Sequence, residues 1–429
     1  MPKNKKPVPR KSSMAPAEDN DVLAQALADL ALDLADRELG DDDAEADPQA
    51  AAGNVGARGK AATPPANAAP PPTPEDLERL VRNALRKKND EVLYGAIERA
   101  RYTDVGAYQL LRERIEEAAA TVTLRRDGAP AMETNAFAVP VFVHSTGGLK
   151  ETEQFQDGAA FDALVASIQA AGLEGPQAKV VLIAHAYDLD EIDRITYSHL
   201  NEMVRDATAS MTDKKLVATP ALERSIVGWQ AGSFSAHDKA VELRFLLGFS
   251  LKRADDPFYQ VPSDEAAADA YFEARMARYR QWTEQAAPLV KQVLAADPAG
   301  LELHFLYQDL VFGAKEQALA ELAMLQMMSD INGALETSGQ APDSVRAVAG
   351  PADVNNEMVL RVAIYGADDE LLVASEKPLD LAADLQTEVD DICDALATLG
   401  IADVSVALRF GADGVPVETS RYEISPDAQ

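Results

Sequence analysis

The stretch from Glu357 to Glu423 most constrains the fold of this chain, because two hairpin patterns flank one helical pattern there. Runs rich in β-branched and aromatic residues at 359–365 and 403–410 each end at an aromatic residue, which is followed by Gly-Ala-Asp and a second apolar run. Between the hairpins, apolar residues recur at steps of three and four, which is typical of a helix with one buried face. These residues are Leu381, Leu385, Val389, Ile392, Leu396 and Leu399. The stretch therefore predicts a helix that covers one face of a four-stranded antiparallel sheet.

The ends and the outer face of this helix can also be assigned. Asp380 is placed to cap the N-terminus, and Gly400 is placed to end the helix in the left-handed conformation. The outer face is acidic and carries Asp384, Glu388, Asp390, Asp391 and Asp394. We interpret this face as a solvated surface; the alternative is a surface that mimics nucleic acid and binds basic proteins.

The composition favours an acidic protein with two folded domains and tails. The 429 residues carry a formal net charge of −31, and 47% of them are hydrophobic, which suffices for real cores. The negative field repels nucleic acid and anionic membranes, so we expect neither as the main partner. The single cysteine, Cys393, excludes an intrachain disulfide framework and a multi-cysteine zinc site. Its place beside the apolar stripe indicates a core residue.

The sequence indicates a cytoplasmic location. It has no apolar run of about 18 residues that would span a membrane. The basic N-terminus also lacks the apolar segment of a signal peptide. We therefore expect a bacterial cytoplasmic protein without a membrane partner.

Residues 1–72 predict a disordered arm and linker, since Pro, Ala, Asp and Gly dominate and aromatic residues are absent. One island stands out, because its leucines recur at helical spacing: Leu23, Leu27, Leu30 and Leu34. An amphipathic helix this short is not stable alone. It either docks into a groove with a basic rim, in a partner or in this chain, or it frays without one.

Residues 73–122 predict a small helical segment. Thr73 as cap and Pro74 at the first helical position give a strong start signal. Basic residues then make the most basic patch of this acidic chain: Arg79, Arg82, Arg86, Lys87 and Lys88. We interpret the patch as pairing with the protein's own acidic surface; the alternative is a binding site for a partner protein. The leucine island is a candidate to cover this patch.

Residues 123–255 predict a first α/β domain. Apolar strands at 137–143 and 180–184 enclose an amphipathic helix, so we expect a crossover with locally parallel pairing of the two strands. A strand at 241–246 alternates as if it were half exposed.

Residues 256–429 predict a second domain, of α+β type, which ends in the hairpin-helix-hairpin. It begins with a helical stretch at 264–295, which Pro288 is expected to kink or interrupt. The stretch 340–353 is expected to be a loop. The fold class is therefore α+β, with two mixed α/β domains after a helical segment and a disordered arm.

The best candidate for chemistry lies after the strand at 180–184. His185 and Asp188 sit where open α/β sheets usually place ligands, and His144 ends the other strand. If the two strands pair in parallel, these side chains can bind a divalent metal or act as acid and base. The simpler interpretation is that Asp188 or Asp190 caps the following helix. Gly147-Gly148 is interpreted as a turn rather than as a phosphate-binding loop.

The order of parts resembles a known family. A helical segment at 86–119, an apolar strand at 136–144 and a later helix and strand at 392–408 follow one another. In this order the chain is similar to an uncharacterised bacterial family that is classified as a domain of unknown function. The resemblance implies a bacterial cytoplasmic protein and brings no catalytic residues.

These features favour a non-enzymatic interaction or regulatory protein. Its expected partners are proteins, including basic ones, and a homodimer is a further option; we expect no cofactor and no metal. The alternative is a metal-dependent or small-ligand-binding enzyme at His144, His185 and Asp188. The third option is the nucleic-acid mimic. The residues named for partner binding are Leu23, Leu27, Leu30, Leu34, Arg79, Arg82 and Arg86.

Overall fold

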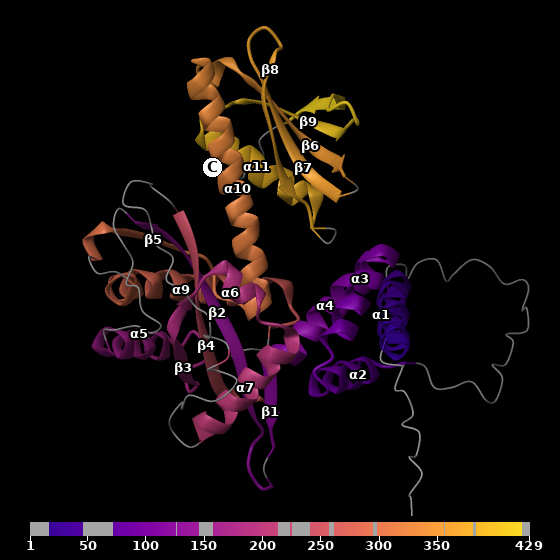
Figure 1. Cartoon of the computed structure of the whole chain (residues 1–429), viewed down its shortest axis with the longest axis vertical. Helices are drawn as coiled ribbons and strands as arrows, with labels where there is room; N and C mark the ends of the chain where they lie inside the picture. The colour runs from indigo at the N-terminus through magenta and orange to yellow at the C-terminus, as the bar shows by residue number, and fades with distance from the viewer. Residues whose placement is uncertain are drawn as a thin grey trace, which may run out of the picture. The chain divides into compact units, whose positions relative to one another are not determined.

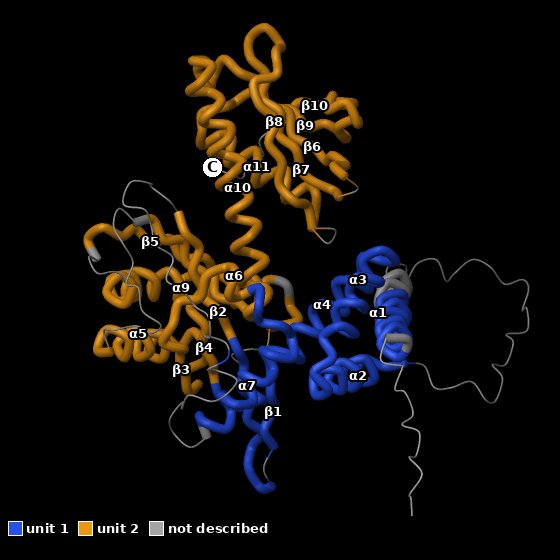
Figure 2. The backbone as a smooth tube through the Cα atoms, in the orientation of Figure 1, with its two compact units in different colours: residues 1–136, 193–227, 251–255 blue, residues 137–192, 228–250, 256–429 orange. Residues whose placement is uncertain are grey.

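The computed structural model describes residues 17–45, 72–125, 127–145, 158–212, 224, 241–256, 261–294, 298–355, 357–380 and 383–422 (Figure 1). These residues form helices and two five-stranded sheets, which confirms the mixed α+β class. None of the described helices is long and apolar enough to cross a membrane. The chain divides into two compact units (Figure 2). Unit 1 comprises residues 1–136, 193–227 and 251–255, and unit 2 comprises residues 137–192, 228–250 and 256–429.

Unit 1 is mainly helical. Its elements are α1 (Ala17–Glu45), α2 (Pro74–Arg86), α3 (Asp90–Thr103), α4 (Val105–Ala120), the short strand β1 (Thr121–Leu124) and α7 (Tyr197–Thr212). α4 contacts the other helices of this unit, and its Leu111 and Ile115 are fully buried. α2 begins as expected: Thr73 and Asp76 form a capping box, and Pro74 occupies the first turn.

Helix α1 corrects the expectation of disorder for residues 17–45. It packs against α3 and α4 and buries Leu27 and Leu34. The spacing of the leucines alone underestimates the extent of the buried face of α1, because small apolar residues also belong to it: Ala24, Ala28, Ala31 and Ala35. Alanines let helices approach closely, so the leucines between them reach a densely packed interior. The remainder of the expected arm and linker lies outside the described residues.

The first sheet contains β2 (Met132–Ser145), β3 (Lys179–Tyr187), β4 (Val241–Arg253) and β5 (Leu301–Phe305) beside β1. The order is β1-β2-β4-β3, and β5 pairs with β2 in antiparallel orientation. The expected direct pairing of 137–143 with 180–184 is therefore wrong, since β4 lies between these strands.

The burial of β4 explains its central position. It is buried from residue 243 to residue 250, whereas the sequence suggested a half-exposed strand. Gly248 makes the close fit possible, because a Cβ there would lie 2.4 Å from Cζ of Phe137 and 2.7 Å from Cδ2 of Leu182. The prediction of a half-exposed strand rested on residues 241–246, which do not include the tightly packed part of the strand around Gly248.

Two helices that pack against each other contribute to the core of unit 2. They are α5 (Gly158–Ala171) and α9 (Glu265–Leu294). Trp282 of α9 is 1% exposed, and its Nε1 donates a hydrogen bond to Ser167 Oγ at 2.9 Å. α9 continues through Pro288 as one helix. The short helix α6 (Leu189–Asp193) follows β3, and η3 (Pro298–Gly300) precedes β5.

The C-terminal sheet follows the long helix α10 (Val311–Ser338) and the turn η4 (Pro342–Ser344). Its strands are β6 (Arg346–Val354), β7 (Glu357–Tyr365), β8 (Leu371–Pro378), β9 (Asp403–Phe410) and β10 (Pro416–Arg421), in the order β10-β9-β6-β7-β8. β7 and β8 form one antiparallel hairpin and β9 and β10 another, with α11 (Leu385–Thr398) between them in the sequence. Val389, Ile392 and Leu396 pack with apolar residues of the sheet. The hairpin-helix-hairpin is therefore confirmed.

Strand β6 corrects the predicted sheet from four strands to five. Its residues fall in the stretch that the sequence suggested to be a loop, because Gly350 and Pro351 interrupt the apolar pattern. β6 pairs antiparallel with β7 and parallel with β9, so the sheet is mixed. A Cβ at Gly350 would lie 2.6 Å from the carbonyl oxygen of Ala407, which explains why a small residue occupies this crowded position.

The N-terminal cap of α11 also differs from the expectation. Asp384, not Asp380, caps the helix, and its Oδ1 accepts a hydrogen bond from the Thr387 amide at 2.9 Å. The helix therefore begins one turn later than the apolar stripe suggested, and Leu381 lies outside the described residues. Gly400 has a φ of 87°, as expected for the residue that ends the helix.

Candidate functional site

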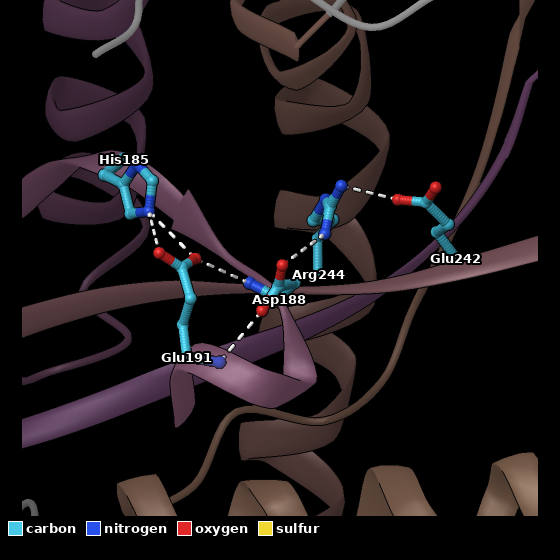
Figure 3. Close-up of polar contacts among 5 residues, drawn as sticks. All are labelled: His185, Asp188, Glu191, Glu242 and Arg244. Atoms are coloured by element: carbon cyan, nitrogen blue, oxygen red, sulfur yellow. Dashed lines mark hydrogen bonds and ion pairs between the residues drawn. The ribbon is translucent and has the colours of Figure 1, made fainter. Parts of the chain in front are cut away.

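The end of β3 and the segment after it contain His185 and Asp188, two of the three residues that the sequence singles out (Figure 3). His185 lies on β3 and is 1% exposed, and Asp188 follows the strand directly. Asp188 and Glu191 form a reciprocal cap at the start of α6. Asp188 Oδ1 accepts from the Glu191 amide at 2.9 Å, and Glu191 Oε2 accepts from the Asp188 amide at 3.1 Å. The simpler interpretation of Asp188 as a helix cap is thus confirmed.

Glu191 connects this cap to the histidine. His185 Nε2 lies 3.3 Å from Glu191 Oε1 and 3.1 Å from Glu191 Oε2, and Tyr187 packs edge-on against the imidazole. Sequence reasoning missed the role of Glu191, although the Asp-x-x-Glu spacing of a capping box was available as a signal. A histidine–carboxylate pair can hold or move a proton. Both side chains are buried, however, so a substrate in solvent does not reach them in this conformation.

Arg244 of β4 gives Asp188 a cationic neighbour that the sequence did not reveal. Its guanidinium lies 3.7 Å from Asp188 Oδ2 and 2.5 Å from Glu242 Oε2. Burial raises the pKa of Glu242, and Arg244 opposes this effect. We call these residues the His185 cluster: His185, Asp188, Glu191, Glu242 and Arg244. Each of its three carboxylates contacts Arg244, His185 or a backbone amide inside the fold, which is the arrangement expected of a structural network.

His144 has a different neighbour. It lies opposite Glu302 of β5 in the sheet, and its Nδ1 is 3.5 Å from Glu302 Oε2. Within the described residues, no three His, Cys, Asp or Glu side chains are grouped so that they could hold a metal ion. The structure therefore does not assemble His144, His185 and Asp188 into the metal site that the sequence suggested. Gly147-Gly148 lies outside the described residues.

A different site appears in unit 1, where the basic residues of α2 line a groove. Arg79, Arg82 and Arg86 recur at steps of three and four, so they share one side of the helix. The groove has a volume of about 400 Å³, and α7 contributes Asn201 and Arg205 to its wall. We call it the arginine groove, and its charged residues are Glu75, Glu78, Arg79, Arg82, Arg86 and Arg205. No sequence pattern indicated Arg205, since the packing of α7 on α2 cannot be read from the sequence.

The guanidinium groups of the arginine groove differ in how they are paired. Arg79 lies 3.2 Å from Asp76 Oδ1, and this hydrogen bond is the largest of the effects that lower the pKa of Asp76. Arg82 Nε lies 2.6 Å from Glu78 Oε1. Arg86 Nε donates to the Arg82 carbonyl oxygen, and both Arg86 and Arg205 are exposed. Neither of these last two has a carboxylate partner among the residues that the structure describes.

The neighbouring basic residue Lys88 pairs with the protein's own acidic surface. Its Nζ lies 2.8 Å from Glu202 Oε2, and Arg224 lies 2.8 Å from the other oxygen of the same carboxylate. The hydrogen bond with Lys88 is the largest of the effects that lower the pKa of Glu202. The patch thus has one part that is paired with the protein's own acidic surface and another part, in the arginine groove, that is open to solvent.

The leucine island packs within unit 1 and lies mainly on α3 and α4. Leu27 and Leu34 are buried, Leu30 is half-buried and Leu23 is 42% exposed. At the N-terminal end of α1, Asp21 pairs with Arg99. At the other end, Arg37 Nη1 donates to the Pro72 carbonyl oxygen at 2.8 Å. A role of these leucines in partner binding stays a prediction.

Comparison with known protein families places most of the chain in one family. The model of the family described as "Protein of unknown function (DUF2863)" matches residues 74–407, and the chain therefore belongs to this family. This confirms the resemblance to a family of unknown function. No curated protein matches the chain, and no solved structure matches it.

Proposed function

We propose that this member of the DUF2863 family is an interaction protein whose arginine groove binds an acidic peptide segment of a partner protein. The observation that carries the proposal is the convergence of four arginines on one groove in a chain of net charge −31. Arg86 and Arg205 are the main binding groups, because both are exposed and have no carboxylate partner among the described residues. We also propose a cytoplasmic location for this protein, on the sequence features alone.

The chemistry of the groove favours carboxylates on a peptide. A guanidinium is planar and presents donors in a fork, so it binds a carboxylate through two parallel hydrogen bonds. Glu75 and Glu78 line the same groove and repel a ligand with densely spaced negative charge. A groove of about 400 Å³ accommodates a few side chains rather than a long polyanion. These features favour a segment in which acidic residues alternate with neutral ones over nucleic acid.

The other candidate functions have less support. An enzyme at His185 requires substrate access to a side chain that is 1% exposed. A nucleic-acid mimic on α11 requires free carboxylates, but three of the five acidic residues of this face are engaged: Asp384 caps the helix, Glu388 pairs with Lys377 and Asp390 accepts a hydrogen bond from Tyr422. A partner with a basic surface is therefore a weaker expectation than an acidic one.

The test is a binding titration of the full chain with fluorescein-labelled peptides, followed by fluorescence anisotropy. One peptide alternates glutamate with glycine, and the second alternates lysine with glycine. We expect the glutamate peptide to bind more tightly than the lysine peptide, and to bind at least about tenfold more weakly to the double variant Arg86→Ser/Arg205→Ser, since hydrogen bonds to charged groups contribute about 1.5–3 kcal/mol each. Inorganic phosphate is added as a competitor.

The matched control is Arg101→Ser/Arg194→Ser. Both residues are exposed arginines of unit 1 outside the groove, so this variant changes the net charge equally. We expect it to change the affinity less than about twofold, because neither residue lines the groove and exposed charges that do not contact the ligand are screened by salt. An equal loss of affinity in both variants, tighter binding of the lysine peptide, or displacement by phosphate at lower concentration than by free glutamate peptide would contradict the proposal.

A further inference from the structure

The C-terminal sheet contains a cavity that the proposed function does not use. Its volume is about 310 Å³, and it lies between α11 and the end of the sheet that β9 and β10 form. α11 contributes Cys393 and Ala397, and the turn after it contributes Ile401 and Ala402. The remaining lining residues are Val404, Arg421 and Tyr422.

Local sequence explains why a cavity forms here. Ala397 and Ala402 have small side chains, which leave space where larger apolar residues would fill the gap. Gly400 lets the chain turn back from the helix toward β9 with a φ of 87°. The Tyr422 amide donates to the Val404 carbonyl oxygen at 3.0 Å, which continues the pairing of β10 with β9. This contact fixes Tyr422 and the preceding Arg421 beside the cavity.

The lining is apolar and neutral except for one cation. Burial and the nearby carboxylates of Asp390 and Asp394 raise the pKa of the Cys393 thiol to about 12, so the thiol is uncharged near neutral pH. The Tyr422 hydroxyl donates to Asp390 Oδ1 at 2.8 Å. Arg421 is exposed and has no carboxylate partner among the described residues. The cavity thus joins an apolar wall to a single available guanidinium.

We propose that this cavity binds a small monocarboxylate with a short apolar body. The carboxylate accepts hydrogen bonds from Arg421, and the apolar body packs against the exposed side chains of Ala397 and Ala402. A second negative charge on the ligand is disfavoured, because Asp390 and Asp394 lie close to the Cys393 side of the cavity. The inference rests on unit 2 alone and does not depend on the arginine groove.

The test uses ligand-observed NMR on the full chain with three probes of similar shape. The probes are 4-methylpentanoate, L-leucine and the neutral 4-methylpentan-1-ol. We expect 4-methylpentanoate to bind at least tenfold more tightly than the alcohol. Tighter binding of L-leucine than of 4-methylpentanoate would identify a free amino acid as the source of the carboxylate and would extend the proposal.

Variants locate the site. Arg421→Gln is expected to weaken the binding of 4-methylpentanoate at least tenfold. Ala397→Leu is expected to weaken the binding of both 4-methylpentanoate and 4-methylpentan-1-ol, because the larger side chain fills the cavity. Arg409→Gln is the matched control, since it removes another exposed arginine of the same hairpin. An affinity that is the same for acid and alcohol, or a loss in Arg409→Gln equal to that in Arg421→Gln, would overturn the proposal. Absence of binding to the wild-type chain would overturn it as well.

Discussion

The His185 cluster and the arginine groove are both groups of charged side chains, but the fold treats them in opposite ways. In the His185 cluster, His185 and Glu191 are 1% and 6% exposed. Each of the three carboxylates contacts a cationic side chain or a hydrogen-bond donor within the cluster. In the arginine groove, Arg86 and Arg205 are exposed and lack a carboxylate partner among the described residues. The sequence drew attention to the first group as a site of chemistry, whereas we propose the second as a site of binding.

Under the proposed function, the pairing and the exposure of charged side chains separate structural from functional charges better than residue type does. A network whose polar groups contact one another stabilises one arrangement of the chain and leaves few groups for a ligand. An exposed cluster of like charges costs self-repulsion unless an opposite charge from elsewhere relieves it. The predictions below test this contrast, from the largest expected effect to the smallest.

The largest effect is expected from the loss of the carboxylate in the His185 cluster. Glu191→Ala leaves His185 Nε2 and the Asp188 amide without the contacts that Glu191 provides. Unpaired buried polar groups cost about 1–3 kcal/mol each, so the free energy of unfolding should fall by about 2–5 kcal/mol. Urea denaturation of the full chain measures this change.

The matched control is the other histidine–glutamate pair of the same sheet. Glu302→Ala removes the partner of His144, but the Glu302 side chain is 85% exposed. We expect the free energy of unfolding to fall by less than about 0.5 kcal/mol, because exposed ion pairs contribute little. Similar losses for Glu191→Ala and Glu302→Ala would show that the His185 cluster is not a structural network.

A smaller effect is expected in the pH dependence of stability, and it should have opposite signs in the two regions. Burial raises the pKa of Glu242 in the folded state, so its contribution to stability is present at low pH and is lost as pH rises through that raised pKa. The hydrogen bond from Arg79 lowers the pKa of Asp76, so the contribution of Asp76 is present above the ordinary aspartate range and is lost as pH falls.

Two neutral variants measure these slopes. Relative to wild type, Glu242→Gln should gain stability as pH rises from about 4 to 7, by no more than about 1 kcal/mol after solvent screening. Asp76→Asn should instead lose stability relative to wild type as pH rises from about 2 to 5, below and through the ordinary aspartate range. Urea denaturation at several pH values gives both slopes, and slopes of the same sign would mean that the two regions do not differ in the way we describe.

The sequence predicted the parts of the fold that depend on local patterns. The hairpins around α11, the start of α2 and the end of α11 at Gly400 follow from turn residues, caps and apolar spacing. β6 and α1 were misjudged for a shared reason, since Gly350 and the alanines of α1 carry little hydrophobic signal. Their small size matters only once a neighbouring element packs against them, as Ala407 does beside Gly350.

The candidate site was predictable only in part for a similar reason. The spacing of Arg79, Arg82 and Arg86 identified one wall of the arginine groove. Arg205 comes from a helix more than a hundred residues later in the chain, and nothing in its local sequence indicates that it lies beside α2. The expectation for His144 and His185 failed because it depended on direct pairing of β2 with β3, and β4 lies between them.

Hydrogen exchange of the full chain, with and without the glutamate peptide, tests the central claim most directly, because it reports on both regions at once. If the arginine groove binds an acidic segment, the peptide should slow exchange in α2 and in the part of α7 around Asn201 and Arg205. Exchange at residues 185–191 should stay unchanged. Slower exchange at 185–191 with no change in α2 and α7 would contradict the account and would indicate that the peptide binds at the His185 cluster.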